Sequence, residues 1–181
     1  INRSNIRIVR TIDMIVNYSR LKVGEYPYNP IRFNICKLIK DLSLEFKPLA
    51  ESKNLDFILE CCQTDIVVNA DEYSIKNAIS YILDNAIKFT SDGFIKISLT
   101  KNENNATFTV EDTGCGISEE YMSRLFESYS QEEEGYNRSF EGTGLGLSLT
   151  KKFLELNNYP LHITSSKNVG TKVSIFLSNI K

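Results

Sequence analysis

Most of the chain's nine glycines lie in two short stretches, Asp112-Thr113-Gly114-Cys115-Gly116-Ile117 and Gly142-Thr143-Gly144-Leu145-Gly146-Leu147-Ser148. Glycine tolerates positive φ angles and lets backbone N–H groups approach a ligand closely. At a helix start, such a stretch can hold phosphate groups and use the helix dipole. Taken alone, each stretch is equally compatible with a pair of turns and a helix cap, since glycine clusters punctuate loops in general.

Two common phosphate-binding motifs do not fit these glycines. The chain has no G-x-x-x-x-G-K-[ST] segment, which excludes a P-loop. A dinucleotide fingerprint would follow a buried strand and place an acidic residue about 20 residues further on. Here the second stretch follows a polar loop, and Thr164 stands at that distance. Neither fold is supported.

The composition is that of an ordinary globular chain of about one domain, with 181 residues, 41% hydrophobic, and 21 basic against 23 acidic side chains. A net charge of -2 argues against a protein that coats nucleic acid or membranes, because either needs a basic field. The chain lacks the roughly 18 consecutive apolar residues of a membrane span. Four cysteines without C-x-x-C spacing and a single histidine argue against zinc and favour a cytoplasmic setting. Because the chain starts at Ile1 with neither Met nor a signal peptide, we expect a fragment of a longer protein.

A domain boundary is expected near residue 27. Isoleucines at positions 1, 8, 12 and 15 form one stripe of an amphipathic helix over residues 1–23, and a narrow stripe needs a partner helix. Gly24, Pro27 and Pro30 then end the helical pattern. We therefore divide the chain into residues 1–27 and 28–181.

The remaining pattern predicts an α+β fold. Strands are expected at 31–34, 57–60, 65–69, 94–99, 107–110, 161–164 and 172–177, and helices at 35–52, 70–90 and 144–157. Pro48 is expected to kink or shorten its helix. Strands and helices occur in mixed order along the chain, with antiparallel hairpins, and this indicates a two-layer sandwich. We expect a mixed, mostly antiparallel sheet with helices on one face, preceded by the helical stem. The polar stretch 128–141 has no periodicity and is typical of a functional lid.

The order of four features is more specific than any one of them: helical Asn85, Asp112 at a strand end, the second glycine stretch, and Gly170-Thr171 entering the last strand. In this order the chain resembles the catalytic, ATP-binding domain of sensor histidine kinases, which are Bergerat-fold ATPases.

The resemblance covers nearly the whole chain. Residues 84–90 are similar to the family's N box, 112–117 to its first glycine box, 125–127 to its phenylalanine box and 141–148 to its second glycine box. Residues 1–25 resemble the second helix of the dimerisation and phosphoacceptor domain.

The resemblance implies a role for Asp112 and Thr171 at adenine. The exocyclic amine of adenine is a donor, and a carboxylate is a strong acceptor for it, so Asp112 is the expected base-recognition residue. Thr171 would support it, through a water if not directly. As bare residues, Asp112 could equally cap a strand end, and Thr171 is an ordinary strand former.

The resemblance also implies a Mg²⁺–triphosphate site. Asn85 would supply a neutral oxygen to Mg²⁺ beside phosphate oxygens, although a buried helix Asn is the plainer interpretation. Lys88 and lid residue Arg138 would neutralise phosphate charge and are the expected catalytic residues. The expected nucleotide-binding set is Asn85, Lys88, Asp112, Gly114, Gly116, Ile117, Gly142, Thr143, Gly144, Leu145, Gly146, Leu147 and Thr171.

One position departs from the family pattern and keeps alternatives open. Many histidine kinases carry a polar residue, often Asn, one turn before the N-box Asn, where this chain has Tyr81. Tyr81 would look into the magnesium site or displace a ligand, since residues 81 and 85 share a helix face. Asp84 could compensate. A nucleotide-binding pseudokinase therefore remains an alternative. The second alternative is a Bergerat-fold ATP hydrolase, but such an enzyme requires a carboxylate general base at this position, which Tyr81 does not supply.

The implied activity is transfer of the ATP γ-phosphoryl group to a histidine on an upstream helix. That helix would precede Ile1, and the chain's one histidine, His162, lies in a predicted strand after every nucleotide motif. Phe126, with Tyr129 near it, would help the domain dock on the stem, although a core Phe is an equally good interpretation. The expected partners are the chain's own phosphoacceptor helix, a response-regulator receiver domain and a second copy joined through the stem. No nucleic acid partner is expected, and the setting would be cytoplasmic, including the cytoplasmic part of a membrane-anchored sensor.

Overall fold

A computed structural model describes residues 3–61, 65–102, 104–130, 143–178 and 180. Its main sheet has five strands in the order β2-β4-β5-β7-β6. Their bounds are β2 Asp56–Cys61, β4 Phe94–Asn102, β5 Asn105–Asp112, β6 Leu161–Ser166 and β7 Gly170–Leu177. β2 runs parallel to β4, and the other neighbouring strands are antiparallel. The predicted mixed, mostly antiparallel sheet is confirmed.

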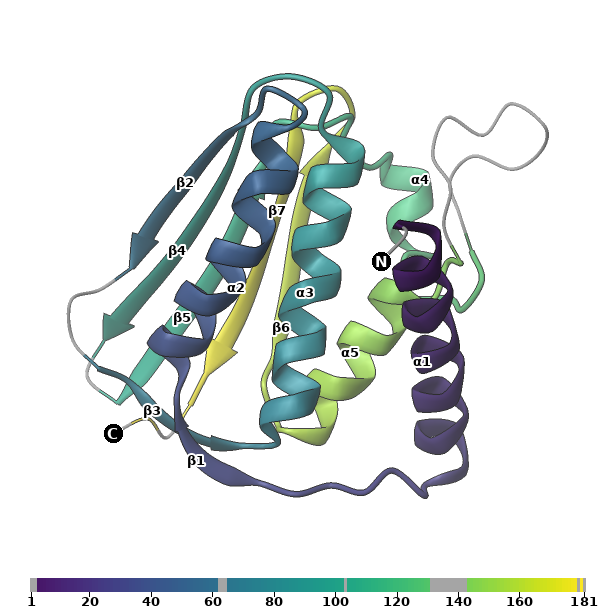
Figure 1. The fold of residues 1–181 in the computed structure, drawn as a ribbon, viewed down its shortest axis with the longest axis vertical. Coiled ribbons are helices and arrows are strands. Elements are labelled where there is room, and N and C mark those ends of the chain that lie inside the picture. Colours follow the sequence, from purple (N-terminus) through teal and green to yellow (C-terminus); the bar gives the residue numbers. More distant parts are fainter. Residues whose placement is uncertain (1–2, 62–64, 103, 131–142, 179, 181) are drawn as a thin grey trace.

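Three helices cover one face of this sheet: α2 (Ile35–Glu51), α3 (Glu72–Phe89) and α5 (Gly146–Leu156) (Figure 1). Alternate strand residues point toward them, so Ile95 and Ile97 are fully buried while Lys96 between them pairs with Glu60 on the other face. Burial of one strand face against amphipathic helices is what holds two such layers together. The predicted two-layer α+β sandwich is confirmed.

The two strands predicted at 57–60 and 65–69 belong to different sheets. The second is observed as β3 (Val67–Ala70), and it pairs antiparallel with β1 (Ile31–Asn34) in a separate ribbon. The Ile35 amide donates to the Ile66 carbonyl, which extends this ribbon into the start of α2. Pairing partners depend on tertiary contacts, so strand periodicity alone did not separate the two sheets.

Helix boundaries differ from the predicted ones where a cap or a proline decides. The Asn34 side chain accepts from Cys36 N and caps α2, which continues through Pro48 to Glu51 rather than being shortened there. Pro48 has no N–H to donate to the carbonyl of Leu44, so the helix lacks one hydrogen bond at this exposed position. α3 begins at Glu72 rather than residue 70 because Asp71 is its N-cap.

Helix α1 (Arg3–Val23) lies beside α5, and the short α4 (Glu119–Met122) lies near the N-terminal end of α1 (Figure 1). The face toward the domain carries Met14, Asn17, Tyr18 and Leu21. The opposite face exposes the predicted stripe at Ile8, Ile12 and Ile15. No helix in the described ranges is both long and apolar enough to cross a bilayer.

A polar cluster at the start of α3 ties the linker after α1 to the helical layer. The Asp71 carboxylate accepts from Ser74 N at 2.7 Å, from the Tyr26 hydroxyl at 3.0 Å and from Asn29 N at 3.0 Å. The side-chain oxygen of Asn157, just past α5, accepts from Asp71 N, and its amide nitrogen donates to Ser74 Oγ. Because Asp71 and Asn157 are buried, these bonds satisfy groups that water cannot reach.

Removing the Asp71 carboxylate is expected to destabilise the fold. Asp71→Ala leaves the Ser74 amide, the Tyr26 hydroxyl and the Asn29 amide without their acceptor, and should lower the free energy of unfolding by about 2 kcal/mol or more. Urea denaturation measures the change. Asp41→Ala, at an exposed α2 position, is the matched control and should stay within about 0.5 kcal/mol of wild type. Equal stability of the two variants would contradict a structural role for the cluster.

Candidate functional site

The first glycine stretch turns back against the C-terminal end of α3. Asp112 ends β5, and its Oδ1 accepts from Gly114 N at 2.9 Å. The Phe89 carbonyl, at the end of α3, accepts from Cys115 N at 3.1 Å. A Cβ on Gly114 would lie 2.6 Å from that same carbonyl oxygen, closer than side chains approach. The close approach therefore requires glycine at this position.

Asp112 sits half-buried opposite Thr171 on the neighbouring strand β7. Burial raises the pKa of the Asp112 carboxyl, and backbone hydrogen bonds from Gly114 and Thr171 partly offset this rise. Gly170 has φ +138°, and a Cβ there would collide with the Asp112 carbonyl. The sheet thus presents a poorly solvated acceptor, the kind of group that recognises a donor strongly once water is displaced.

Sequence reasoning missed Ser165, which joins these parts. Its Oγ accepts from Ile117 N at 2.9 Å, donates to the Gly170 carbonyl at 2.8 Å and lies 2.9 Å from Thr171 Oγ1. Ser165 lies directly across from Thr171 in the β6–β7 pairing. The pairing register of the last hairpin was the signal that could have found it.

The second glycine stretch forms the approach to α5. Gly144 has φ +70°, and a Cβ there would lie 2.7 Å from the Tyr129 backbone. Its carbonyl accepts from Tyr129 N at 3.1 Å, so the chain segments on either side of residues 131–142 meet here. Leu145 is buried, and the helix starts at Gly146 rather than at the predicted residue 144 because of the left-handed Gly144.

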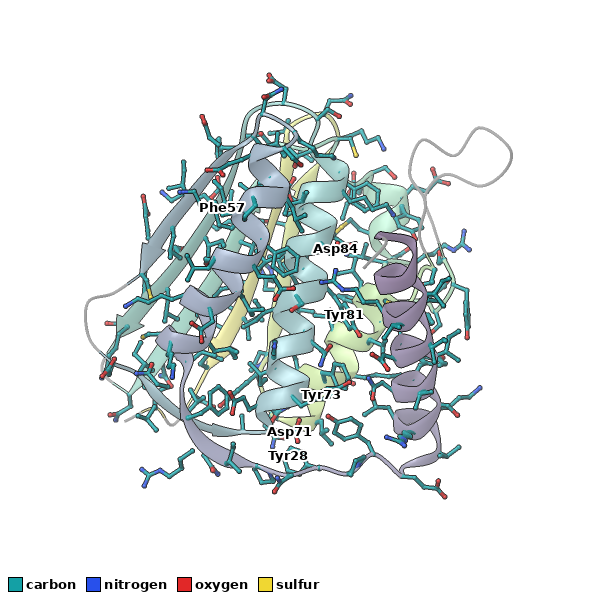
Figure 2. The ribbon with its side chains drawn as sticks, viewed as in Figure 1. Tyr28, Phe57, Asp71, Tyr73, Tyr81 and Asp84 are labelled. Atoms are coloured by element: carbon teal, nitrogen blue, oxygen red, sulfur yellow. The ribbon has the colours of Figure 1, made fainter. Side chains whose placement is uncertain are left out.

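Asn85 and Tyr81 both face the start of α5. A Cβ built on Gly146 would lie 3.8 Å from Tyr81 Cβ and 4.0 Å from Asn85 Nδ2. Tyr81 also packs against the core, between α3 and α1 (Figure 2). Burial raises the pKa of the Tyr81 phenol, with Tyr73 and Asp13 adding to the rise, so it stays a neutral hydroxyl. The shared face predicted for residues 81 and 85 is confirmed.

Helix α3 is the element that relates the two glycine stretches. Its C-terminal end contacts the first stretch at Gly114, and Asn85, one turn earlier, faces the second at Gly146. The Lys88 ammonium lies 4.5 Å from the centre of the Phe89 ring, in the same turn. These contacts are flanked, within the described chain, by Gly116, Ile117, Thr143 and Leu147. Two further predicted site residues, Arg138 and Gly142, lie outside the described residues.

The donor set fits a magnesium ion held largely by a ligand's own oxygens. The described part of the chain contains no group of three or more His, Cys, Asp or Glu side chains arranged to hold a metal. Asn85 offers a side-chain amide beside a helix start, and Mg²⁺ commonly takes one or two protein oxygens together with phosphate oxygens. The residues present therefore suit a cation that arrives with a polyphosphate.

Residues 70–180 match the profile of the family described as "Histidine kinase-, DNA gyrase B-, and HSP90-like ATPase". The chain belongs to this ATPase family. The curated relatives to which it is similar are sensor histidine kinases. It is 29% identical over 179 residues to the autoinducer 2 sensor kinase/phosphatase LuxQ of Vibrio cholerae and 32% identical over 179 residues to the virulence sensor protein BvgS of Bordetella bronchiseptica. These alignments cover 96% and 94% of this chain, but 21% and 14% of those proteins.

Solved structures agree with this family assignment. Full-length ShkA, in complex with AMPPNP, superposes with a TM-score of 0.82 at 19% identity, covering 96% of this chain and 36% of that one. The catalytic domain of the histidine kinase ThkA superposes with a TM-score of 0.72 at 25% identity, covering 83% of this chain and 96% of that one. The fold is that of the histidine kinase ATPase domain.

On this ATPase domain, α1 contacts the segments that flank residues 131–142. The Ser128 hydroxyl donates to Tyr18 Oη at 2.8 Å, and the Tyr18 ring packs edge-on against Tyr129. Met14 Sδ lies 4.0 Å from Thr143 Oγ1. Of the two residues predicted to form the docking surface, Phe126 lies beneath the Lys151 ammonium of α5, which is 4.8 Å from the ring centre. Within the described part of the chain, the aromatic contact between α1 and the domain is the one between Tyr18 of α1 and Tyr129.

Ionisation of Asp112 should lower the stability of wild type relative to the Asp112→Asn variant as pH rises. The folded-state pKa is raised, so the folded state binds the proton more tightly than the unfolded state does. The resulting stability is present below the unfolded pKa of about 3.9 and is lost as pH rises through the higher folded value. Asp112→Asn keeps an acceptor for Gly114 N without the charge, so at pH 7 its melting temperature should equal or exceed that of wild type. Thermal unfolding from pH 4 to 7 measures both effects, and a variant that melts well below wild type at pH 7 would refute the argument.

Loss of the Tyr18 hydroxyl should loosen α1. Tyr18→Phe removes the bond from Ser128, a contribution of about 1 kcal/mol, which corresponds to about fivefold more local opening. Trypsin cleavage after Arg20 and Lys22 should accelerate accordingly when cleavage is slower than reclosing. Tyr28→Phe, at an exposed linker position, is the control and should be cleaved at the wild-type rate. Equal rates for both variants would show that the bond contributes nothing to docking.

Proposed function

We propose that this chain binds Mg·ATP between its two glycine stretches and α3, and supplies the γ-phosphoryl group to a histidine on an upstream helix. The observation that carries the proposal is the Asp112 carboxylate, which is partly desolvated and held between Gly114 and Thr171 at the end of β5. A buried carboxylate with a raised pKa costs stability, and a site retains such a group where it serves binding. Membership of the ATPase family supports a nucleotide as the ligand of that group.

The adenine end would be formed by Asp112, Thr171 and the first glycine stretch. Asp112 would accept from the exocyclic amine, and the Thr171–Ser165 hydroxyl pair lies ready to donate or accept beside it. Gly114 and Gly116 present no side chains, so the backbone there can lie against a flat base. Ile117, whose amide is held by Ser165, would add an apolar contact.

The phosphate end would be formed by α3 and the start of α5. The N-terminal end of α5 carries a partial positive charge, which favours an anion near Gly146. Asn85 faces that point and would contribute a ligand to Mg²⁺, which when bound screens phosphate charge. Lys88 would add a second positive charge. We assign the same role to Arg138, and we include Gly142, Thr143, Gly144, Leu145 and Leu147 in the phosphate-binding segment.

The phosphoryl acceptor would come from outside this chain. His162 alternates with Leu161 and Ile163, which pack against the core, so it lies on the sheet face that the helices do not cover. His162 is thus on the face of the sheet opposite to the one that carries Asp112, Thr171 and the helices. The isolated chain should therefore bind nucleotide without phosphorylating itself.

The partners proposed follow from the part of the relatives that this chain spans. It covers about a fifth of LuxQ, so further segments belong to such proteins. We propose that residues 1–27 are the second helix of a phosphoacceptor stem and its linker, that residues 28–181 form the catalytic domain, and that the exposed Ile8, Ile12 and Ile15 stripe joins a second copy. A receiver domain would accept the phosphoryl group in turn, in a cytoplasmic setting.

Nucleotide titration by calorimetry tests the proposal. Wild type should bind ATP more tightly with Mg²⁺ than with EDTA. Asp112→Asn loses the charged acceptor, and a charge-assisted bond of 1.5–3 kcal/mol corresponds to roughly a tenfold to hundredfold weaker Kd in both buffers. Asn85→Ala should weaken binding chiefly when Mg²⁺ is present. Asp41→Asn, at an exposed α2 position, should bind as wild type does.

Three outcomes would contradict parts of the proposal. Absence of ATP binding by the folded wild type would refute it as a whole. Identical affinity with Mg²⁺ and with EDTA would refute the metal role of Asn85. It would favour the pseudokinase alternative, in which Tyr81 displaces a magnesium ligand and nucleotide binding no longer depends on the metal. Wild-type affinity in Asp112→Asn would refute the adenine assignment alone.

A further inference from the structure

Lys53 contacts the end of α3 from the turn between α2 and β2. Its ammonium donates to three backbone carbonyls at the C-terminal end of α3, those of Ile87 at 2.7 Å, Lys88 at 3.2 Å and Thr90 at 3.2 Å. An ammonium carries three donors, and here each has an acceptor. The positive charge also opposes the partial negative charge that a helix carries at this end.

The other carbonyls of this helix end have different donors. The Ala86 carbonyl accepts from Thr90 N and Thr90 Oγ1, and the Phe89 carbonyl accepts from Cys115 N. Lys53 therefore satisfies the positions that neither the helix cap nor the glycine stretch reaches. Since the last carbonyls of a helix have no intrahelical partner, such donors decide whether the final turn keeps its shape.

The segment that carries Lys53 is itself well anchored. It follows α2 directly, where Lys53 N and Leu55 N both donate to the Ala50 carbonyl. Asn54 takes a left-handed conformation with φ +61°, and Leu55 is buried in the core. The lysine stem thus starts from a fixed point, so its ammonium can hold α3 in place rather than follow it.

The turn that Lys53 holds is the one on which the proposed nucleotide site depends. Lys88 lies within this turn, and Asn85 lies one turn before it. The Phe89 carbonyl accepts from Cys115 N and lies close against Gly114. Asp112, in turn, bonds to Gly114 N. A shift of this turn would move a proposed phosphate-binding residue and the adenine-binding loop together.

We propose that Lys53 is a positioning residue for nucleotide binding: it fixes the last turn of α3, and through that turn both Lys88 and the first glycine stretch. Lys53 acts through these groups and is not itself assigned to contact the nucleotide. The inference rests on the proposed ATP site. A purely structural helix cap would instead contribute to folding stability and leave affinity in the folded protein unchanged.

Three variants separate the two roles. Lys53→Met removes the charge and donors while keeping most of the stem length, and Lys53→Arg keeps a charged multiple donor. Lys47→Met, in α2, removes the same charge from an exposed ion pair with Glu51 and is the matched control. Each protein is used at 20 °C, after circular dichroism has shown that it is fully folded there, and ATP affinity is measured with Mg²⁺ and with EDTA.

Lys53→Met should bind ATP about tenfold more weakly than wild type in both buffers, the effect expected for loss of a charged hydrogen-bonding group. Lys53→Arg should recover most of this loss, and Lys47→Met should bind as wild type does. A lower melting temperature for Lys53→Met with unchanged ATP affinity would overturn the proposal. So would equal weakening by Lys47→Met, which would indicate a nonspecific charge effect.

Amide hydrogen exchange without nucleotide tests the same proposal independently of ATP binding. Lys53→Met should accelerate exchange at Thr90 and Cys115, whose amides depend on the last turn of α3, and leave the β4–β5 ladder at Ile97 unchanged. Unchanged exchange at Thr90 and Cys115 would overturn the proposal. If wild type fails to bind ATP, the proposed function is refuted, while this measurement still decides whether Lys53 positions the loop.

Discussion

The close contact between the end of α3 and the first glycine stretch is the constraint on which the site depends. The Phe89 carbonyl accepts from Cys115 N and lies where a Gly114 side chain would be. Only a residue without Cβ lets the chain leave β5 and turn back against the helix end at this distance. The contact fixes the position of the Asp112 carboxylate relative to the end of α3, so the strand layer and the helix layer meet at the edge that holds the candidate site.

The polar groups at this edge are arranged so that most have a partner within the protein. Ser165 connects the first glycine stretch to β7, and backbone amides of Gly114 and Thr171 bond to Asp112. Burial nevertheless raises the pKa of the Asp112 carboxyl, so the charged form costs folding free energy. The protein accepts that cost at Asp112, while the buried carboxylate of Asp71 at the other end of α3 accepts three hydrogen bonds from within the protein. The contrast separates a group available to a ligand from a group that supports the fold.

Helix α1 has two different faces, and each meets a different surface. One face contacts the ATPase domain through Asn17, which donates to the Tyr73 hydroxyl, and through Tyr18, which accepts from Ser128. The other face exposes apolar side chains to solvent. A helix built in this way can join a second helix without leaving the domain, since the two contacts use opposite sides. The face toward the domain combines these hydrogen bonds with the partly buried Met14 and Leu21, whereas the apolar stripe on the other face would gain from burial.

The sequence alone determined the α+β class, the helix layer and the identity of most candidate residues. Hydrophobic periodicity is a local property, and it indicated α2, α3, α5 and the β4–β5 hairpin within a few residues of their observed ends. The order Asn85, Asp112, second glycine stretch and Thr171 pointed to the ATPase family before any geometry was available. The spacing of residues 81 and 85 likewise placed them on one helix face.

Tertiary structure decided what local patterns cannot encode. Whether residues 65–69 would join the main sheet or pair with β1 depended on which strand edge was available, and the start of α5 depended on the contact of Gly144 with Tyr129. The contacts of Ser165 and Lys53 depended on register and on hydrogen bonds that span 48 and 34 residues, respectively. The sequence does not mark out this serine or this lysine from any other, because they bond to backbone groups, which every residue carries. Only the folded chain selects which of those groups comes within hydrogen-bonding distance.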